Sequence, residues 1–184
     1  MSGNEFAFAL IKPDGMEMGL RDQIREMLVA DGKLSIIMEA EFSISPLQAA
    51  RHYDKSDHWC QRLGAKRHDI LSKRGGVSKT PTELGKEILA VIRENMTMGK
   101  VHAFILSGEQ ANATLRKIVG ATDPAFAEPG TIRALSTDSM KIADEELRQV
   151  RNVIHASESP ADARKEIMNL WPELSSLMQF LLFP

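Results

Sequence analysis

EFAFALIKPDG (residues 5–15) sets the architecture of this chain of 184 residues. Its first seven residues are nearly all apolar, and they run into Lys-Pro-Asp-Gly, which is typical of a turn. A short apolar run closed by turn residues predicts a buried strand over Glu5 to Ile11. Lys12 then stands at the carboxyl end of this strand, where a positive charge can meet an anion. A solvated lysine in an ordinary turn is the alternative interpretation.

Three further strands are predicted downstream, with helices between them. Apolar runs place these strands at Leu34–Phe42, Val101–Leu106 and Val150–Ile154. Helical spacing and capping residues predict helices at 20–28, 82–95, 109–119 and 141–149, and further helices that begin at Pro46 and Pro160. The polar, basic segment 54–79 gives no clear pattern. This order favours an α+β fold in one domain, a ferredoxin-like sandwich with helices on one face of a four-stranded antiparallel sheet.

Composition excludes several classes of protein. A net charge of −2 lacks the broad basic surface with which proteins hold duplex nucleic acid. The only cysteine is Cys60, so an intrachain disulfide and a cysteine-based zinc site are both excluded. The N-terminus does not read as a signal peptide, and no apolar run approaches the roughly eighteen residues that span a membrane. We therefore expect a cytoplasmic protein with no membrane partner, and we expect the apolar tail 177–184 to dock on the core or on a partner subunit.

Two later segments carry residues suited to phosphate chemistry. Arg116, Thr122 and Arg133 lie in or beside one loop, and guanidinium groups bind phosphoryl oxygens with a fork of donors. His155 follows a short apolar run and precedes a predicted helix that contains Glu166. An imidazole that such a carboxylate orients is a competent nucleophile. Arginines in ordinary ion pairs and a purely structural histidine are the alternatives.

Taken together, these segments resemble the nucleoside diphosphate kinase family. FALIKPDG (8–15) resembles that family's first strand and active-site lysine, and HY (52–53) resembles its tyrosine position. RKIVGATDPAFAEPGTIR (116–133) resembles its phosphate-binding run, and VRNVIHASESPADARKEI (150–167) is similar to its signature around the phosphorylated histidine. The chain has no GxxxxGK[ST] loop, which excludes a P-loop kinase.

The resemblance implies a kinase that moves the γ-phosphate of ATP to a nucleoside diphosphate. His155 would be the nucleophile and form a phosphohistidine, which gives ping-pong kinetics. Glu166 and Ser157 would hold its ring and its surroundings, Tyr53 would lie beside it, and Lys12 would contact the sugar hydroxyl and the transferring phosphoryl group. Mg²⁺ would bridge the phosphates with few protein ligands.

The same resemblance implies how a nucleoside di- or triphosphate is bound. The β- and γ-phosphates would meet three side chains of the loop region, and the ribose would meet an asparagine. The base would lie against an aromatic ring and an aliphatic side chain four residues apart on one helical face. The implied nucleotide-binding residues are Lys12, Trp59, Leu63, Arg116, Thr122, Arg133 and Asn152.

Two segments depart from the short members of the family. Residues of about 64–84 and 134–149 have no counterpart there, so we expect a single domain that carries two insertions, as in longer variants from archaea and some bacteria. The resemblance also implies homo-oligomers built from dimers, with hexamers common, in which the loop 129–133 and the apolar tail form interfaces.

Two other functions are weighed against the kinase. A nucleotide-binding regulatory module of the same fold, with weak or no kinase activity, is one alternative. A nucleic-acid-binding protein that uses Lys66, Arg67, Lys73 and Arg74 is the other, and there a solvated helix face is favoured, so no nucleic acid is expected.

Overall fold

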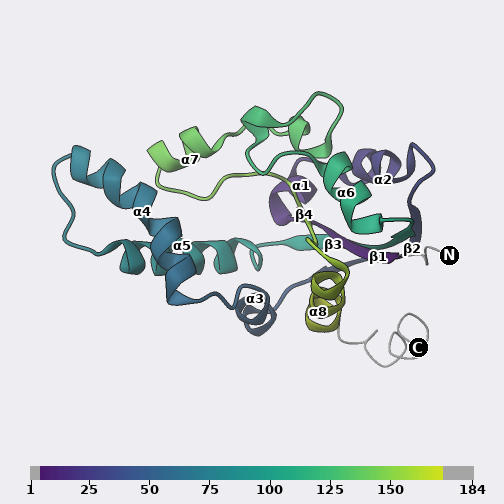
Figure 1. The fold of residues 1–184 in the computed structure, drawn as a ribbon, viewed down its shortest axis with the longest axis horizontal. Helices are drawn as coiled ribbons and strands as arrows, with labels where there is room; N and C mark the ends of the chain where they lie inside the picture. The colour runs from purple at the N-terminus through teal and green to yellow at the C-terminus, as the bar shows by residue number, and fades with distance from the viewer. Residues whose placement is uncertain (1–4, 172–184) are drawn as a thin grey trace.

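The centre of the fold is an antiparallel sheet of four strands in the order β2-β3-β1-β4 (Figure 1). The structure is a computed structural model that describes residues 5–171. β1 (Glu5–Ile11) pairs with β3 (Lys100–Gly108) on one side and β4 (Ile154–Ala156) on the other, and β2 (Ser35–Ser43) pairs with β3. The predicted α+β fold and its four-stranded antiparallel sheet are confirmed.

Helices cover both faces of this sheet, so the expectation of one covered face is wrong. Alternate residues of β1 point to opposite sides: Ala7 and Ile11 join one apolar core, and Phe8 and Leu10 join the other. All four are fully buried, because a strand with no polar face needs cover on both sides. The covering helices are α2 (Arg21–Val29) and α6 (Ala111–Val119) on the first side, and α3 (Pro46–His52) and α8 (Pro160–Leu170) on the second.

Helices begin where the capping residues of the sequence place them. Ser45 and Thr80 each form a capping box, ahead of α3 and α5 (Pro81–Asn95). The segment without a clear pattern contains the 17-residue helix α4 (Asp57–Lys73). A short helix, α1 (Pro13–Glu17), follows β1 directly where only a turn was expected.

The chain ahead of β4 differs from its prediction. The expected strand Val150–Ile154 is wrong, because β4 begins only at Ile154. Val153 has a φ of +56°, and the N–H of Ile154 donates to the carbonyl of Asn152 at 2.7 Å, so the backbone makes a three-residue turn instead of a strand. The expected helix 141–149 is shorter than predicted: α7 (Met140–Glu145) is followed by Leu147, whose φ is +55°. The loop before it holds two short 3-10 helices, η1 (Pro124–Phe126) and η2 (Ile132–Leu135).

α4 and α5 form a helical hairpin that projects away from the sheet (Figure 1). The two backbones touch at two glycines. A Cβ added to Gly64 would lie 1.9 Å from the carbonyl oxygen of Pro81, and one added to Gly85 would lie 1.8 Å from that of Cys60. Only glycine permits so close an approach of the two helices.

The two segments expected to be insertions lie against each other. Residues 64–84 fall on the outer part of the α4–α5 hairpin, and 134–149 include α7. The guanidinium of Arg67 donates to the carbonyl of Arg148 at 3.3 Å, and that of Arg74 donates to the carbonyl of Glu145 at 3.1 Å. The division into one domain with two insertions stays a prediction.

No helix within residues 5–171 has the length and apolar character needed to cross a membrane. The cytoplasmic location stays a prediction. The apolar tail 177–184, with its expected docking role, lies outside the described residues.

The contact at Gly85 generates a stability prediction. Gly85→Ala places a methyl group on the Cys60 carbonyl, so the helices must separate, and we expect a loss of about 1–3 kcal/mol in the free energy of unfolding. Urea denaturation measures it. Gly99→Ala is the control, because its added Cβ would lie 3.4 Å from Pro13, an ordinary contact. Equal stability of Gly85→Ala and the wild type would contradict the close approach.

Candidate active site

A cavity of about 640 Å³ collects the predicted site residues. It is open between the start of the α4–α5 hairpin, the loop after α6, the chain before β4 and the first turns of α8. All of the predicted residues except Leu63 and Ser157 line it. They are Lys12, Tyr53, Trp59, Arg116, Thr122, Arg133, Asn152, His155 and Glu166.

The left-handed turn at Val153 aims the chain into this cavity. A buried, β-branched residue with positive φ is strained, at a cost of about 1–3 kcal/mol. The segment after β1 holds it: the N–H of Lys12 donates to the Val153 carbonyl at 2.9 Å, and the N–H of Val153 donates to Oδ2 of Asp14 at 3.0 Å. Gly15 must be glycine, because its Cβ would lie 2.6 Å from the Val153 oxygen.

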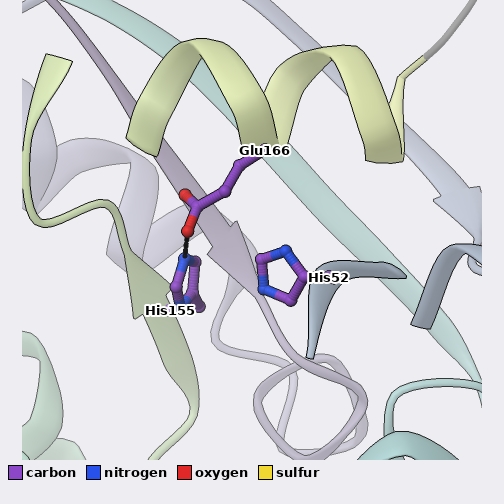
Figure 2. Close-up of side chains that lie close together, drawn as sticks. All are labelled: His52, His155 and Glu166. Carbon is purple, nitrogen blue, oxygen red and sulfur yellow. Dashed lines mark ion pairs between the residues drawn. The ribbon is translucent and has the colours of Figure 1, made fainter. Parts of the chain in front are cut away.

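His155 stands on β4, two residues after this turn. Its Nε2 lies 2.9 Å from Oε1 of Glu166, which projects from α8 (Figure 2). The approach is bent, since neither Nε2 nor Oε2 of the glutamate makes a hydrogen bond of good geometry within residues 5–171. A carboxylate at Nε2 favours the tautomer with its proton there, which leaves the lone pair on Nδ1.

His52, at the end of α3, packs its ring against that of His155. The two ring centroids are 5.0 Å apart with an interplanar angle of 82° (Figure 2). Burial lowers the pKa of His52 to about 3, and the charges of His155, Lys55 and Lys165 act in the same direction. His52 is therefore neutral near pH 7. In the sequence His52 stands out only as part of the HY pair, and its contact with His155 depends on how α3 packs against α8 and α5.

Five lysine and arginine side chains line the cavity, and three of them are the predicted Lys12, Arg116 and Arg133. Lys12 is buried, which lowers its pKa, and its Nζ lies 3.9 Å from Asp14. Arg133 donates to the carbonyls of Gly120 and Ile154 at 3.1 and 3.2 Å, and burial lowers the pKa of its guanidinium to about 10. Arg116 is more exposed and pairs with Glu158 at 3.5 Å. A group with several negative oxygens fits between these charges.

The loop after α6 is fastened to β4 by the predicted ribose-binding residue. The side-chain amide of Asn152 is buried and donates to the carbonyl of Thr122 at 2.9 Å. The bond joins the chain just before His155 to the loop between Arg116 and Arg133. Asn152 thus positions the loop that carries the phosphate-binding candidates.

The aromatic side of the cavity is formed by Tyr53 and Trp59. Burial raises the pKa of Tyr53 to about 12, so its hydroxyl keeps its proton, and the Tyr53 carbonyl accepts from Arg93 at 2.7 Å. Trp59 lies in the first turn of α4, with Nζ of Lys55 5.9 Å from its ring centroid. Leu63 does not line the cavity, although its neighbour Arg62 on α4 does. Ile92 and Gln149 line the cavity instead.

Ser157 supports the backbone after His155 and not the imidazole ring. Its Oγ is fully buried, donates to Oδ1 of Asn112 at 2.8 Å and accepts from the N–H of Phe8 at 3.0 Å. Asn112 in turn donates to the carbonyl of Phe6 at 2.9 Å. These bonds fix the end of β4 to β1 and α6. Sequence reasoning missed Asn112, since a lone asparagine in a predicted helix carries no signal.

The basic residues weighed as a nucleic-acid surface have partners within the chain. Lys66 pairs with Asp144 and Lys73 with Asp69, at 2.5 and 2.7 Å. The guanidinium groups of Arg67 and Arg74 donate to carbonyls of the α7 segment, as described above. The contacts of Lys66, Arg67 and Arg74 join α4 and its end to residues 144–148, whereas the pair of Lys73 with Asp69 lies within α4.

Comparison with known proteins bears on the site directly. Residues 82–175 match the family model for nucleoside diphosphate kinase. A nucleoside diphosphate kinase of Pyrobaculum aerophilum is 34% identical over 170 residues, which cover 89% of this chain and 92% of the relative. This chain belongs to the nucleoside diphosphate kinase family. A nucleoside diphosphate kinase of Listeria monocytogenes is 31% identical over 163 residues, which cover 89% of this chain and 86% of the relative.

Solved structures of the family share this fold. The crystal structure of an NDP kinase from Pyrobaculum aerophilum superposes with a TM-score of 0.80 at 34% identity, covering 92% of this chain and 96% of that one. A transition state mimic of the nucleoside diphosphate kinase from Borrelia burgdorferi, with bound vanadate and ADP, has a TM-score of 0.70 at 27% identity, covering 91% and 86%. The expected family, fold and kinase activity are confirmed, and the roles of the individual residues stay predictions.

The low pKa of His52 generates a prediction about acid stability. Below pH 6.5 the unfolded chain protonates this ring while the folded chain, with a pKa of about 3, does not. Stability therefore falls as the pH drops from 6.5 towards 3, by up to about 1.4 kcal/mol per pH unit from this group. We expect His52→Gln to show a shallower fall than the wild type in denaturation series over this range. The control, His58→Gln, changes an exposed ring on α4 and should keep the wild-type slope. Identical slopes for all three proteins would contradict the prediction.

Proposed function

We propose that this kinase transfers the γ-phosphate of a nucleoside triphosphate to a nucleoside diphosphate through a phosphohistidine on Nδ1 of His155. The observation that carries the proposal is the contact of Nε2 with Glu166 at 2.9 Å. It occupies one ring nitrogen and leaves the other as the nucleophile. His155, Lys12, Arg116 and Arg133 line one cavity, so the nucleophile and the charges that suit a triphosphate share one site.

The transfer takes two balanced steps. In the first, the lone pair of Nδ1 attacks the γ-phosphorus, the bond from that phosphorus to the bridging oxygen breaks, and the nucleoside diphosphate leaves with the electron pair. The imidazole keeps its proton on Nε2, and the positive charge that develops on the ring is balanced by the Glu166 carboxylate. In the second, a terminal oxygen of another diphosphate attacks the phosphoryl group, and the N–P electrons return to Nδ1. One site serves both halves, which gives ping-pong kinetics.

Positive charge is the main support for these steps. Phosphoryl transfer depends on positioning and on stabilising charge over the equatorial oxygens. Lys12 and Arg133 suit this role because their backbone or carbonyl contacts hold them in place before the nucleotide arrives. Arg116 is freer and can exchange its contact with Glu158 for a phosphate.

Mg²⁺ fits this site as a companion of the nucleotide. The acidic residues that line the cavity are Glu158, Asp162 and Glu166, and each already has a partner: Arg116, Ser159 and His155 respectively. Phosphate oxygens and water would therefore supply most ligands of the ion. When bound, it would neutralise phosphate charge together with Lys12, Arg116 and Arg133.

The base of the nucleotide would stack on Trp59. The ring lines the cavity, and stacking on an indole face accepts every base. This proposal accounts for a kinase with broad nucleotide specificity, with Gln149 and Ile92 facing the base where Leu63 does not.

Labelled ATP tests the nucleophile. We expect the wild type incubated with γ-³²P-ATP and Mg²⁺ to form an acid-labile phosphoprotein, and His155→Ala to show only background label. His58→Ala, an exposed histidine on α4, is the control and should label fully. Label retained by His155→Ala would overturn the assignment. Formation of GTP from GDP with excess ATP separates the kinase from a regulatory module, since the module would bind nucleotide without turnover.

We further propose that the protein is a homo-oligomer built on dimers. The loop that leads from α6 into residues 129–133, which are expected at an interface, carries Phe126, which is 77% exposed. β2 also has a free outer edge nine residues long among the described strands. An exposed ring of this size and an open strand edge are both suited to contact with a second copy.

Light scattering after size exclusion measures the assembly. We expect a mass above one chain for the wild type, and a smaller assembly for Phe126→Ser. Met98→Ser is the matched control, because Met98 is 75% exposed but lies outside the loop. A monomeric wild type would contradict the oligomer, and an unchanged Phe126→Ser would remove the loop from the interface.

A further inference from the structure

His52, His155 and Glu166 bring three metal-ligating groups together from three different elements. They come from the end of α3, from β4 and from α8, and one ligand atom of each lies within 4.8 Å of the other two (Figure 2). The kinase reaction proposed above uses His155 and Glu166 but gives no task to the donor atom of His52. The reaction therefore does not account for the presence of His52 in the cluster.

The spacing of these atoms suits one small cation. Ligands of a tetrahedral zinc ion, at about 2.0–2.1 Å from the metal, lie roughly 3.3 Å from one another. Nε2 of His155 and Oε1 of Glu166 are already 2.9 Å apart. Bringing the widest separation in the cluster, 4.8 Å at most, to the same value needs a shift of about 1.5 Å, within reach of one imidazole turning on its side-chain bonds.

Two of the polar atoms in the cluster are buried and poorly satisfied. Within residues 5–171, Nε2 of His155 and Oε2 of Glu166 lack a hydrogen bond of good geometry. Buried polar atoms in native proteins are nearly always paired, and the bent contact of Nε2 with the carboxylate at 2.9 Å leaves both groups able to take a better partner. A cation with an affinity for both nitrogen and oxygen would satisfy Nε2 and one carboxylate oxygen together.

We propose that His52, His155 and Glu166 form a binding site for a divalent transition-metal ion, best Zn²⁺, in the protein free of nucleotide and phosphoryl group. Two imidazoles and one carboxylate are a donor set that zinc favours, with water as the fourth ligand. Mg²⁺ prefers oxygen ligands and is not expected there. The site is thus distinct from the magnesium that accompanies the nucleotide.

Metal at this site would silence the kinase, an effect that rests on the proposed role of His155. An ion on Nε2 takes the place of the proton there, and the neutral imidazole then carries its proton on Nδ1. Nδ1 has no free lone pair in that tautomer, so the attack on phosphorus is blocked. The positive charge of the ion also replaces the negative charge that would balance the developing imidazolium. Metal binding and phosphoryl transfer therefore oppose each other.

Direct binding tests the site without any assay of activity. The nucleotide-free protein is titrated with Zn²⁺ by calorimetry, and with Co²⁺ to read the visible absorption of a tetrahedral ion. We expect one ion per chain for the wild type, and at least tenfold weaker binding for both His52→Gln and Glu166→Gln. His58→Gln should bind as the wild type does. No binding by the wild type, or equal affinity in His52→Gln and the wild type, would overturn the site.

Labelling from γ-³²P-ATP tests the consequence. We expect Zn²⁺ loaded before the removal of free metal to lower the label on wild-type His155 at least tenfold. Treatment with EDTA, followed by its removal and fresh Mg²⁺, should restore the label, and His52→Gln should lose this sensitivity relative to its own metal-free label. Equal labelling of loaded and metal-free wild type would overturn the silencing effect. A metal-free wild type that never labels contradicts the proposed function instead, and leaves the binding result to stand alone. Near-ultraviolet circular dichroism checks that each variant is folded.

Discussion

The active site depends on the backbone at Val153, which a few hydrogen bonds hold in a left-handed turn. Without that turn β4 would start earlier, and the alternation of side chains would carry His155 to a different position against α8. The turn is strained by about 1–3 kcal/mol. Two hydrogen bonds, one that the Lys12 N–H donates and one that the Asp14 carboxylate accepts, are each worth about 1 kcal/mol and offset a cost of this order. The KPDG segment thus does two things. It supplies Lys12 to the cavity, and it holds in place the strand that carries His155, the proposed nucleophile.

The two segments expected to be insertions also hold the chain that leads into β4. Arg148 makes a two-pronged pair with Asp138 at 2.6 and 2.8 Å, and this pair lowers the pKa of the Asp138 carboxyl to about 2. Asp138 also accepts from the backbone N–H of Arg151 at 2.7 Å, directly before Asn152. Arg67 on α4 donates to the Arg148 carbonyl. One connected set of hydrogen bonds therefore joins the hairpin that carries Trp59 to the chain that leads to His155. These segments therefore link Trp59, the proposed platform for the base, to the chain that carries His155.

Local signals predicted much of this from the sequence, and long-range contacts account for the rest. β1, the helix starts at Pro46 and Pro160, and the pairing of His155 with Glu166 all follow from residues close together in the chain. The turn at Val153 does not, because the carboxylate that stabilises it is 139 residues away. The same holds for Ser157 and Phe8, which are 149 residues apart, and for His52, whose place beside His155 is set by the packing of α3. Pattern reasoning erred at 150–154 because apolar residues there read as a strand, while tertiary bonds impose a turn.

The contact between Glu166 and His155 explains why one geometry suits both of the proposed activities, phosphoryl transfer and metal binding, which oppose each other. A carboxylate close to Nε2 readies Nδ1 for phosphorus only while nothing else competes for the imidazole lone pair and the carboxylate charge. Burial keeps His52 neutral beside them, so the cluster presents two imidazoles that can ligate and one anion. The same burial and the nearby cations disfavour protonation of His52, whereas a metal ion bound at the cluster would gain three ligands at once. The arrangement that makes a good nucleophile is therefore also one that a transition metal can capture, unless a nucleotide already fills the cavity.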